Sequence, residues 1–187
     1  MVTTDNRRVR MTKRMIKDAY LELLEKYPAE KISVTEICKS ADVNRSTFYM
    51  YYEDTVVLRR EIETEVLEQI PVISDLSGSV TSQQQFLDLL EHFFAYIQEN
   101  ERLFRILLLQ SDNRAFNRRL IETVLDKYDI RPGEKTLLVT EYAYIYCVSG
   151  VIGILGNWIE DGFPISAQQF AELALKISLQ VNEVENV

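Results

Sequence analysis

Histidine, cysteine and tryptophan are scarce in this sequence of 187 residues, which contains one histidine, two cysteines and one tryptophan. Cys38 and Cys147 are far apart, and neither has a cysteine or histidine at metal-ligand spacing. No nucleophile, base and acid can be assembled around His92, the only histidine, and the sequence has no phosphate-binding loop. We therefore expect a cytoplasmic protein with two reduced thiols, no bound metal or cofactor, and no enzymatic activity.

Glycine and proline, the residues that most often break regular structure, number six and four. They mark breaks at residues 71–82, 131–133 and 161–164. Between these breaks, apolar residues recur at helical spacing, so the fold is predicted to be all-α. The first break is the predicted boundary between an N-terminal domain at 8–68 and a larger helical domain at 72–187. Helices are expected near residues 11–27, 54–70, 83–99, 101–110, 114–128, 134–159 and 167–186, with two shorter ones between 33 and 52.

The longest stretch without a charged residue spans 18 residues, 142–159, which is the lower limit for a membrane span. Its three tyrosines and three glycines lower its hydrophobicity, so a central helix buried within its subunit and against a partner is the simpler interpretation. The basic N-terminus is followed by no apolar segment, and we therefore expect neither a signal peptide nor a membrane anchor.

Residues 33–52 have the pattern of two short helices joined by a tight turn. Ser33 and Glu36 form an S-x-x-E capping box, which predicts a helix beginning at the residue after Ser33. Asn44 is suited to cap a second helix beginning at the following residue, which leaves three residues for the turn. Among these three, Asp42 tolerates the left-handed conformation that such a turn usually needs.

The second of these helices begins with polar side chains. An ordinary helical hairpin with solvated polar residues is the alternative interpretation. In a helix-turn-helix, however, the first turn of the second helix reaches base edges in the major groove, and Arg45, Ser46 and Thr47 occupy that turn. Tyr49 and Tyr51, one turn later, are suited to phosphate oxygens. The choice of residues therefore favours DNA binding.

The net charge of −8 is unusual for a DNA-binding protein, but it is unevenly distributed. Residues 1–60 carry 12 Lys and Arg and 9 Asp and Glu, a balance of +3, and the remaining 9 basic and 20 acidic residues give −11. A basic cluster that could meet the phosphate backbone or a minor groove precedes the motif: Arg7, Arg8, Arg10, Lys13, Arg14 and Lys17.

The segments ISVTEICKSADV and NRSTFYMYYEDTVVL, preceded by an amphipathic helix, resemble the signature of the TetR family of bacterial transcriptional regulators. The resemblance covers residues 8–68, and beyond them extends only to the all-helical pattern and the segment GVIGILGNWIEDGF. It implies that Thr35 holds a phosphate, that residues 45–47 read bases and that Tyr49 clamps the backbone. The candidate DNA-binding residues are thus Thr35, Asn44, Arg45, Ser46, Thr47, Tyr49 and Tyr51.

Two positions depart from the family pattern. Asp42 stands where the family usually has glycine, and Thr55 stands where a phosphate-binding lysine commonly follows the recognition helix. The second departure removes one expected backbone contact, although the helix N-terminus after Asp54 could still offer amide groups to a phosphate.

The C-terminal part is expected to be a regulatory and dimerisation domain. Its aromatic residues are mostly core, but a pocket among them would suit an apolar effector. The pocket candidates are His92, Tyr96, Phe104, Tyr146 and Trp158, although a lone histidine on an aromatic-rich helix is more often structural.

The last two predicted helices, 134–159 and 167–186, are expected to pack against their symmetry mates as a four-helix bundle. The dimerisation candidates are the small residues Gly150, Gly153 and Gly156, which allow close approach of helix axes, and the apolar stripe of Phe170, Leu173 and Ile177. The alternative is that the glycines face a helix of the same subunit.

The function expected from these features is a homodimeric repressor that binds a palindromic double-stranded operator and is released by a small apolar effector. The alternative is an adaptor-type regulator of the same fold, controlled by a partner protein on the acidic C-terminal part and without an effector. An enzyme with an incidental helix pair is disfavoured, because no catalytic constellation is visible.

Overall fold

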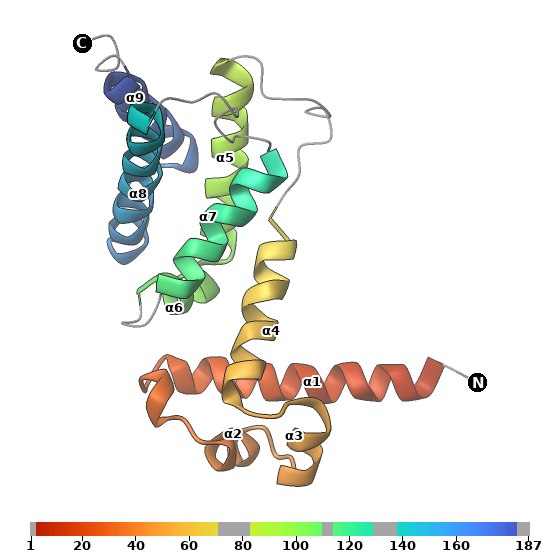
Figure 1. Ribbon diagram of the computed structural model, residues 1–187. Helices are drawn as coiled ribbons and strands as arrows, with labels where there is room; N and C mark the ends of the chain where they lie inside the picture. The colour runs from red at the N-terminus through yellow and green to blue at the C-terminus, as the bar shows by residue number, and fades with distance from the viewer. Residues whose placement is uncertain (1–2, 71–82, 110–113, 129–137, 183–187) are drawn as a thin grey trace. The chain divides into compact units, whose positions relative to one another are not determined.

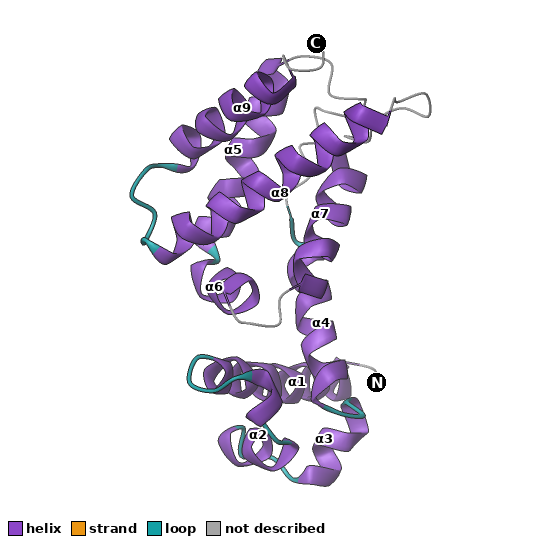
Figure 2. Cartoon of the chain, turned by 60° about the vertical axis from the view of Figure 1, so that its left-hand side comes forward, coloured by secondary structure: helices purple, strands orange, loops and turns teal. Residues whose placement is uncertain are grey.

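Figure 1 shows the computed structural model, which describes residues 3–70, 83–109, 114–128 and 138–182. Within these ranges all regular structure is helical, which confirms the predicted all-α class (Figure 2). The chain forms two compact units, Met1–Glu68 and Gln69–Val187. Each unit buries its own set of apolar side chains.

The N-terminal unit consists of α1 (Thr3–Leu24), a 3₁₀ turn (Ala29–Lys31), α2 (Val34–Ser40), α3 (Arg45–Tyr51) and α4 (Thr55–Glu68). Helix α1 packs against α2, and α2 packs against α3. The buried side chains include Ile16, Tyr20, Leu24, Ile37, Phe48 and Leu58. The capping signals placed the starts of α2 and α3 correctly at Val34 and Arg45.

Two apolar residues that lie at helical spacing with buried neighbours are exposed. Tyr27 is 51% exposed because α1 ends at Leu24, before Tyr27 is reached. Val57, in the first turn of α4, is 41% exposed. Helical spacing predicts the direction of an apolar stripe, but it does not predict where the neighbouring elements stop covering it.

The C-terminal unit consists of α5 (Gln83–Glu99), α6 (Glu101–Leu109), α7 (Arg114–Tyr128), α8 (Leu138–Glu160) and α9 (Ala167–Asn182). These bounds agree closely with the predicted helices. The predicted extensions at 134–137, at Gln110 and at 183–186 lie outside the described residues. Helix α9 packs against α5 and α8, and α6 packs against α8.

Three buried aromatic rings connect the helices of this unit. Phe94 of α5 lies edge-on to Phe170 of α9, with 4.7 Å between ring centroids, and Trp158 of α8 stacks on Phe170 at 4.5 Å. The Trp158 indole N–H donates to the Ile165 carbonyl oxygen at 2.9 Å, so its polar atom is satisfied. The only tryptophan of the chain is therefore a structural residue at the centre of the α5, α8 and α9 packing.

The predicted break between α8 and α9 contains two residues in the left-handed region, Gly162 with φ of 72° and Phe163 with φ of 59°. Glycine adopts this conformation readily, whereas phenylalanine does so at a cost. Phe163 is held there because its ring packs on Trp158 at 4.6 Å and its N–H donates to the Trp158 carbonyl oxygen at 2.9 Å.

Among the described residues, no helix, α8 included, is long and apolar enough to cross a bilayer.

Candidate nucleic-acid interface

Two helix starts build the helix-turn-helix. The Ser33 hydroxyl accepts the Glu36 N–H at 3.3 Å, and the Glu36 carboxylate accepts the Ser33 N–H at 2.8 Å. The Ser33 N–H, and then the Ser33 hydroxyl, which donates to the same carboxylate at 2.8 Å, hold the pKa of Glu36 below its ordinary value. Asn44 occupies the N-cap position of α3, as predicted, but its side chain makes no capping hydrogen bond. The exposed Asn44 side chain is thus not engaged by its own helix.

The turn between α2 and α3 places Asp42 in the left-handed region, with φ of 51°. Asp is one of the few residues besides glycine that enter this region at low cost. The Val43 N–H closes the turn by donating to the Cys38 carbonyl oxygen at 3.0 Å. Asp42 therefore forms the tight turn for which the family usually employs glycine.

Helix α3 rotates by about 100° per residue, so its side chains fall into rows of residues four apart. Phe48 and Tyr52 form the buried row, with 0% and 1% exposure. Ser46 and Met50 form the opposite row, which points away from the core, and Met50 is 73% exposed. Ser46 is among the DNA-binding candidates predicted from the sequence, but Met50 is not, because an apolar residue in an amphipathic helix is usually assigned to the core.

The two flanking rows of α3 differ in exposure. Arg45 and Tyr49 are exposed and contact each other, with 3.5 Å between Arg45 Nη2 and the Tyr49 hydroxyl oxygen. Thr47 and Tyr51, on the other flank, are half-buried. Among the predicted contact residues of α3, Arg45, Ser46 and Tyr49 are therefore the most accessible.

The first turns of α2 and α4 differ in what they offer to a phosphate. Thr35, in the first turn of α2, is exposed, as a phosphate contact requires. At the start of α4, in contrast, the Asp54 carboxylate accepts the Val57 N–H at 2.8 Å. A carboxylate there already occupies the positive end of the helix dipole and repels a second anion. The missing lysine at Thr55 is thus not compensated by this helix N-terminus.

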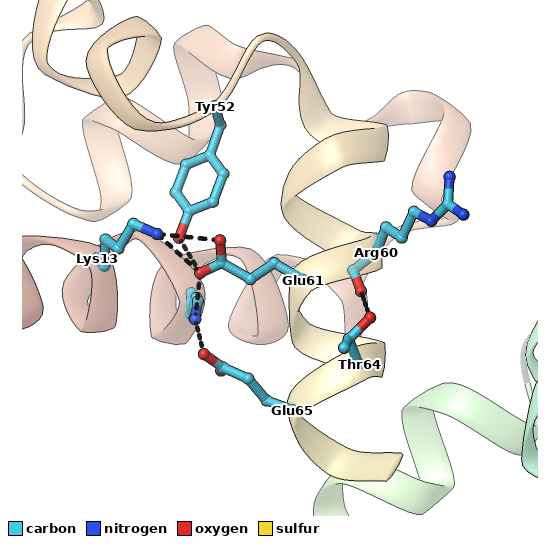
Figure 3. A network of polar contacts seen from close by, with 7 residues as sticks. Lys13, Tyr52, Arg60, Glu61, Thr64 and Glu65 are labelled. Carbon is cyan, nitrogen blue, oxygen red and sulfur yellow. Dashed lines mark hydrogen bonds and ion pairs between the residues drawn. The ribbon is translucent and has the colours of Figure 1, made fainter. Parts of the chain in front are cut away.

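A network of charged side chains ties α3 to α1 and α4 (Figure 3). Glu61 of α4 accepts hydrogen bonds from the Tyr52 hydroxyl and from the Lys13 ammonium of α1, both at 3.0 Å. Lys17 of α1 lies 2.6 Å from Glu61 and 2.6 Å from Glu65. Because Tyr52 directly follows α3 and its ring is buried, the network fixes the end of α3 relative to the other two helices.

The network shifts the pKa values of Glu61, Lys17 and Tyr52. Partial burial would raise the pKa of Glu61, but hydrogen bonds from Lys17, Lys13 and Tyr52 outweigh it and lower the pKa below 4.5. Burial would likewise lower the pKa of Lys17, but the two carboxylates raise it above 10.5. The pKa of Tyr52 is raised, first by burial and then by Glu61. Near neutral pH, Glu61 and Lys17 are therefore charged and Tyr52 is protonated.

The basic cluster at the start of the chain divides into two groups. Lys13 and Lys17 belong to the network and are not directed to a ligand, which departs from their predicted role as phosphate contacts. Their partner Glu61 is 48 residues from Lys13 in sequence, so no local pattern could have indicated this pairing. The exposed members are Arg7, Arg8, Arg10 and Arg14.

Residues 84–180, just over half of the chain, match the TetR-type family described as "Transcriptional regulator C-terminal region". The chain belongs to the TetR family of transcriptional regulators. This match lies in the C-terminal part of the chain, whereas the resemblance was carried by the N-terminal helix-turn-helix segment. The match therefore confirms the resemblance from a separate part of the sequence.

Solved structures of several regulators share this fold. A TetR transcriptional regulator from Streptococcus agalactiae 2603V is 22% identical, with a TM-score of 0.70 over 95% of this chain and 99% of that one. NalD, the secondary repressor of the MexAB-OprM multidrug efflux pump in Pseudomonas aeruginosa, is 19% identical, with a TM-score of 0.59 over 91% and 94%. The dihydroxyacetone kinase operon activator DhaS is 22% identical, with a TM-score of 0.58 over 91% and 96%. A search of curated proteins gave no match.

The five pocket candidates of this TetR-family regulator lie in separate environments. Tyr96 and Phe104 are buried and contact each other edge-on, with 5.6 Å between ring centroids. Trp158 belongs to the aromatic cluster with Phe94 and Phe170. His92 is exposed, and its Nδ1 lies 2.6 Å from the Asp88 carbonyl oxygen one turn earlier, whereas Tyr146 is 64% exposed. The structure thus brings together Tyr96 and Phe104 but leaves His92 and Tyr146 at the surface.

The dimerisation candidates also separate into groups. Gly150 and Gly153 are exposed, and a Cβ atom at either would meet nothing of the described residues within 4 Å, so neither glycine faces another of the described helices. Gly156 does, because a Cβ atom there would lie 3.6 Å from Leu109 Cδ2 of α6. Leu173 and Ile177, one turn apart on α9, are 42% and 43% exposed.

Phe170 requires a correction, because it is 3% exposed and packs on Phe94 and Trp158 inside its own subunit. The stripe of apolar residues on α9 is wide enough to extend beyond the core of the subunit. Phe170, on one side of the stripe, is buried in the core, whereas Leu173 and Ile177, on the other side, are exposed to solvent.

Proposed function

We propose that this regulator binds palindromic duplex DNA sequence-specifically as a homodimer and represses transcription from it. The observation that carries the proposal is the arrangement of α3. Its inner row is buried and anchored to α1 and α4, and its outer rows present Arg45, Ser46 and Tyr49 to solvent. A helix held rigidly in a helix-turn-helix with such an outer face is suited to the major groove. The exposed arginines at the start of α1 add positive charge to the same unit.

The proposed roles of the side chains follow from their chemistry. Arg45 and Ser46 contact base edges, with Thr47 at the margin because it is half-buried. Thr35, Asn44, Tyr49 and Tyr51 contact phosphate oxygens and thereby set the register of the protein on the duplex.

The proposed dimer is formed by α8 and α9. On α8, a row of exposed residues at spacings of three and four runs along the helix: Tyr146, Ser149, Gly150, Gly153 and Asn157. On α9, which packs beside α8, Leu173 and Ile177 are exposed. Small residues allow helix axes to approach closely, and exposed aliphatic side chains gain from burial, so this face is suited to an isologous contact.

Repression by occupancy of the operator is the proposed direction of control, with a small apolar effector that binds the C-terminal unit near Tyr96 and Phe104. The similar structures include a protein named as a repressor and one named as an activator, so the fold alone favours neither direction. An adaptor-type regulator controlled by a partner protein is the second candidate, because His92 and Tyr146 lie at the surface and not in a shared apolar site.

Selection of random duplex DNA with the purified protein tests the proposal. We expect recovery of a palindrome whose half-sites lie about one helical turn, roughly 34 to 36 Å, apart. Equal affinity for selected and scrambled duplexes would contradict specific binding.

Transcription from a reporter carrying the palindrome, with and without the protein, tests the direction of control. For a candidate effector, linkage requires that effector and operator weaken each other's binding by the same factor, and calorimetry without this reciprocity would favour the partner-protein alternative.

A further inference from the structure

We propose that Met50 contacts the methyl group of a thymine in the major groove and is a specificity-determining residue. This inference rests on the proposed DNA-binding function and names a feature of the sequence that the protein recognises.

The position of Met50 on α3 is the first reason. Phe48 and Tyr52 define the direction of the core, and Met50 lies on the opposite side of the helix, at 73% exposure. Single exposed apolar side chains are common on protein surfaces and need no partner. Met50, however, lies between the exposed Arg45–Tyr49 row and the half-buried Thr47–Tyr51 row, at the centre of the surface that would enter the groove.

The chemistry of the groove is the second reason. Base edges in the major groove present hydrogen-bond donors and acceptors and one apolar group, the C5-methyl of thymine. A thioether side chain has no strong donor or acceptor. Among the base-edge groups, the thymine methyl is therefore the one that a methionine at this position can contact favourably without leaving polar atoms unpaired.

The length of the side chain is the third reason. A recognition helix brings its N-terminal residues closest to the bases, so residues further along stand farther away and need longer side chains. In the outermost row, the short Ser46 comes first and the long, unbranched Met50 follows one turn later, about 6 Å along the axis. The order of short and long side chains fits a helix inclined to the groove floor.

Deoxyuridine provides the test, because it differs from thymidine only by the methyl group. Starting from the selected palindrome, each thymine of the half-site is replaced symmetrically by deoxyuridine, and operator affinity is measured by titration. For the wild-type protein we expect one position at which affinity falls, by about fourfold per half-site and about fifteenfold for both, as estimated for the loss of one buried methyl group. Met50→Ala should bind the thymine duplex more weakly and should be insensitive to deoxyuridine at that position.

Two further variants separate a contact from an indirect effect. Met50→Leu should keep part of the sensitivity, because it is also apolar and long. Met11→Ala removes an equally prominent methionine, 64% exposed on α1, and should leave the thymine-to-deoxyuridine ratio unchanged. An effect of the methyl group on DNA shape would persist in Met50→Ala, and that result would overturn the proposal. So would a selected half-site without A·T pairs. Failure to select any sequence would instead refute the DNA-binding function itself.

Discussion

At the residue scale, Arg45 and Tyr49 are neighbours with different expected roles. The Arg45 guanidinium presents several donors in a fixed geometry that matches the acceptors of guanine, whereas the Tyr49 hydroxyl is suited to a single phosphate oxygen. Their 3.5 Å contact, together with 6.0 Å between the guanidinium carbon and the ring centroid, restricts the orientations of Arg45. Tyr49 therefore also helps to hold Arg45 before DNA arrives, which lowers the entropy lost on binding.

Substitution of these two residues should produce different patterns of loss. Arg45→Ala should relax the preference at one base pair of each half-site, by about 1 to 3 kcal/mol. Tyr49→Phe should weaken binding nearly uniformly across sequences, because a phosphate carries no sequence information. Both variants are measured against a set of palindromes in which each base pair is changed in turn, with a scrambled duplex as reference. The same pattern of losses for both would show that the assigned roles are incorrect.

Single-residue predictions succeeded where local chemistry determines the outcome. The capping box of Ser33 and Glu36 and the left-handed conformation of Asp42 depend only on residues close in sequence, and both occur in the structure. The side chain of Asn44 does not cap its helix, although its position was correct. Phe170 was placed on the wrong face because helical spacing cannot distinguish a stripe that faces the subunit core from one that faces a partner.

At the scale of elements, the Glu61 network joins three helices through one carboxylate. Tyr52 connects it to the end of α3, Lys13 and Lys17 to α1, and Glu61 itself belongs to α4. Helix α1 begins at Thr3 and not near residue 11, as was predicted. The starts of α2 and α3 were predictable from their caps, because a cap is a property of a short segment. The network was not, since it pairs residues of α1 with residues of α4, and their juxtaposition exists only after folding.

The network should make stability depend on acid pH. Because the pKa of Glu61 is lowered by folding, its contribution is complete above the ordinary value of 4.5 and is lost as pH falls through the lower, folded-state pKa. At pH 7, Glu61→Gln should lower the free energy of unfolding by about 1 to 3 kcal/mol. The difference from wild type should shrink at pH values below 4.5, as followed by urea unfolding with circular dichroism.

A matched variant controls for the general effect of acid. Glu22→Gln, at an exposed position of α1, should change the free energy of unfolding by less than about 0.5 kcal/mol at pH 7 and at pH 3.5. A Glu61→Gln deficit that stays constant from pH 7 to pH 3.5 would mean that the carboxylate stabilises the unit through its shape and not its charge.

At the scale of the whole molecule, the sequence predicted the order of the helices and the TetR-type fold, because the helix-turn-helix segment and the helix breaks are encoded locally. It left open whether the three glycines of α8 face the same subunit or a partner. Among the described residues, a Cβ atom at Gly150 would meet nothing within 4 Å. The same holds for Gly153, whereas Gly156 faces Leu109 of α6. A helix turns by about 300° over three residues, so Gly153 and Gly156 point in distinct directions.

This difference supports a sharp test of the proposed dimer. Gly153→Leu should fold, because a Cβ atom there would meet nothing of the described residues within 4 Å and a glycine is removed from a helix interior. In the dimer, the same side chain should overpack the contact by about 1 to 3 kcal/mol per substituted site, and two sites are substituted. Gly156→Leu should instead lower the thermal stability of the subunit, because its side chain would extend into Leu109, from which even a Cβ atom is only 3.6 Å away.

Sedimentation, circular dichroism and operator binding, measured on both variants, distinguish the outcomes. A folded Gly153→Leu monomer with reduced operator affinity supports dimerisation through α8, because two linked recognition helices are needed for a palindrome. A Gly153→Leu protein that remains dimeric and binds the operator as wild type would place the dimer contact elsewhere.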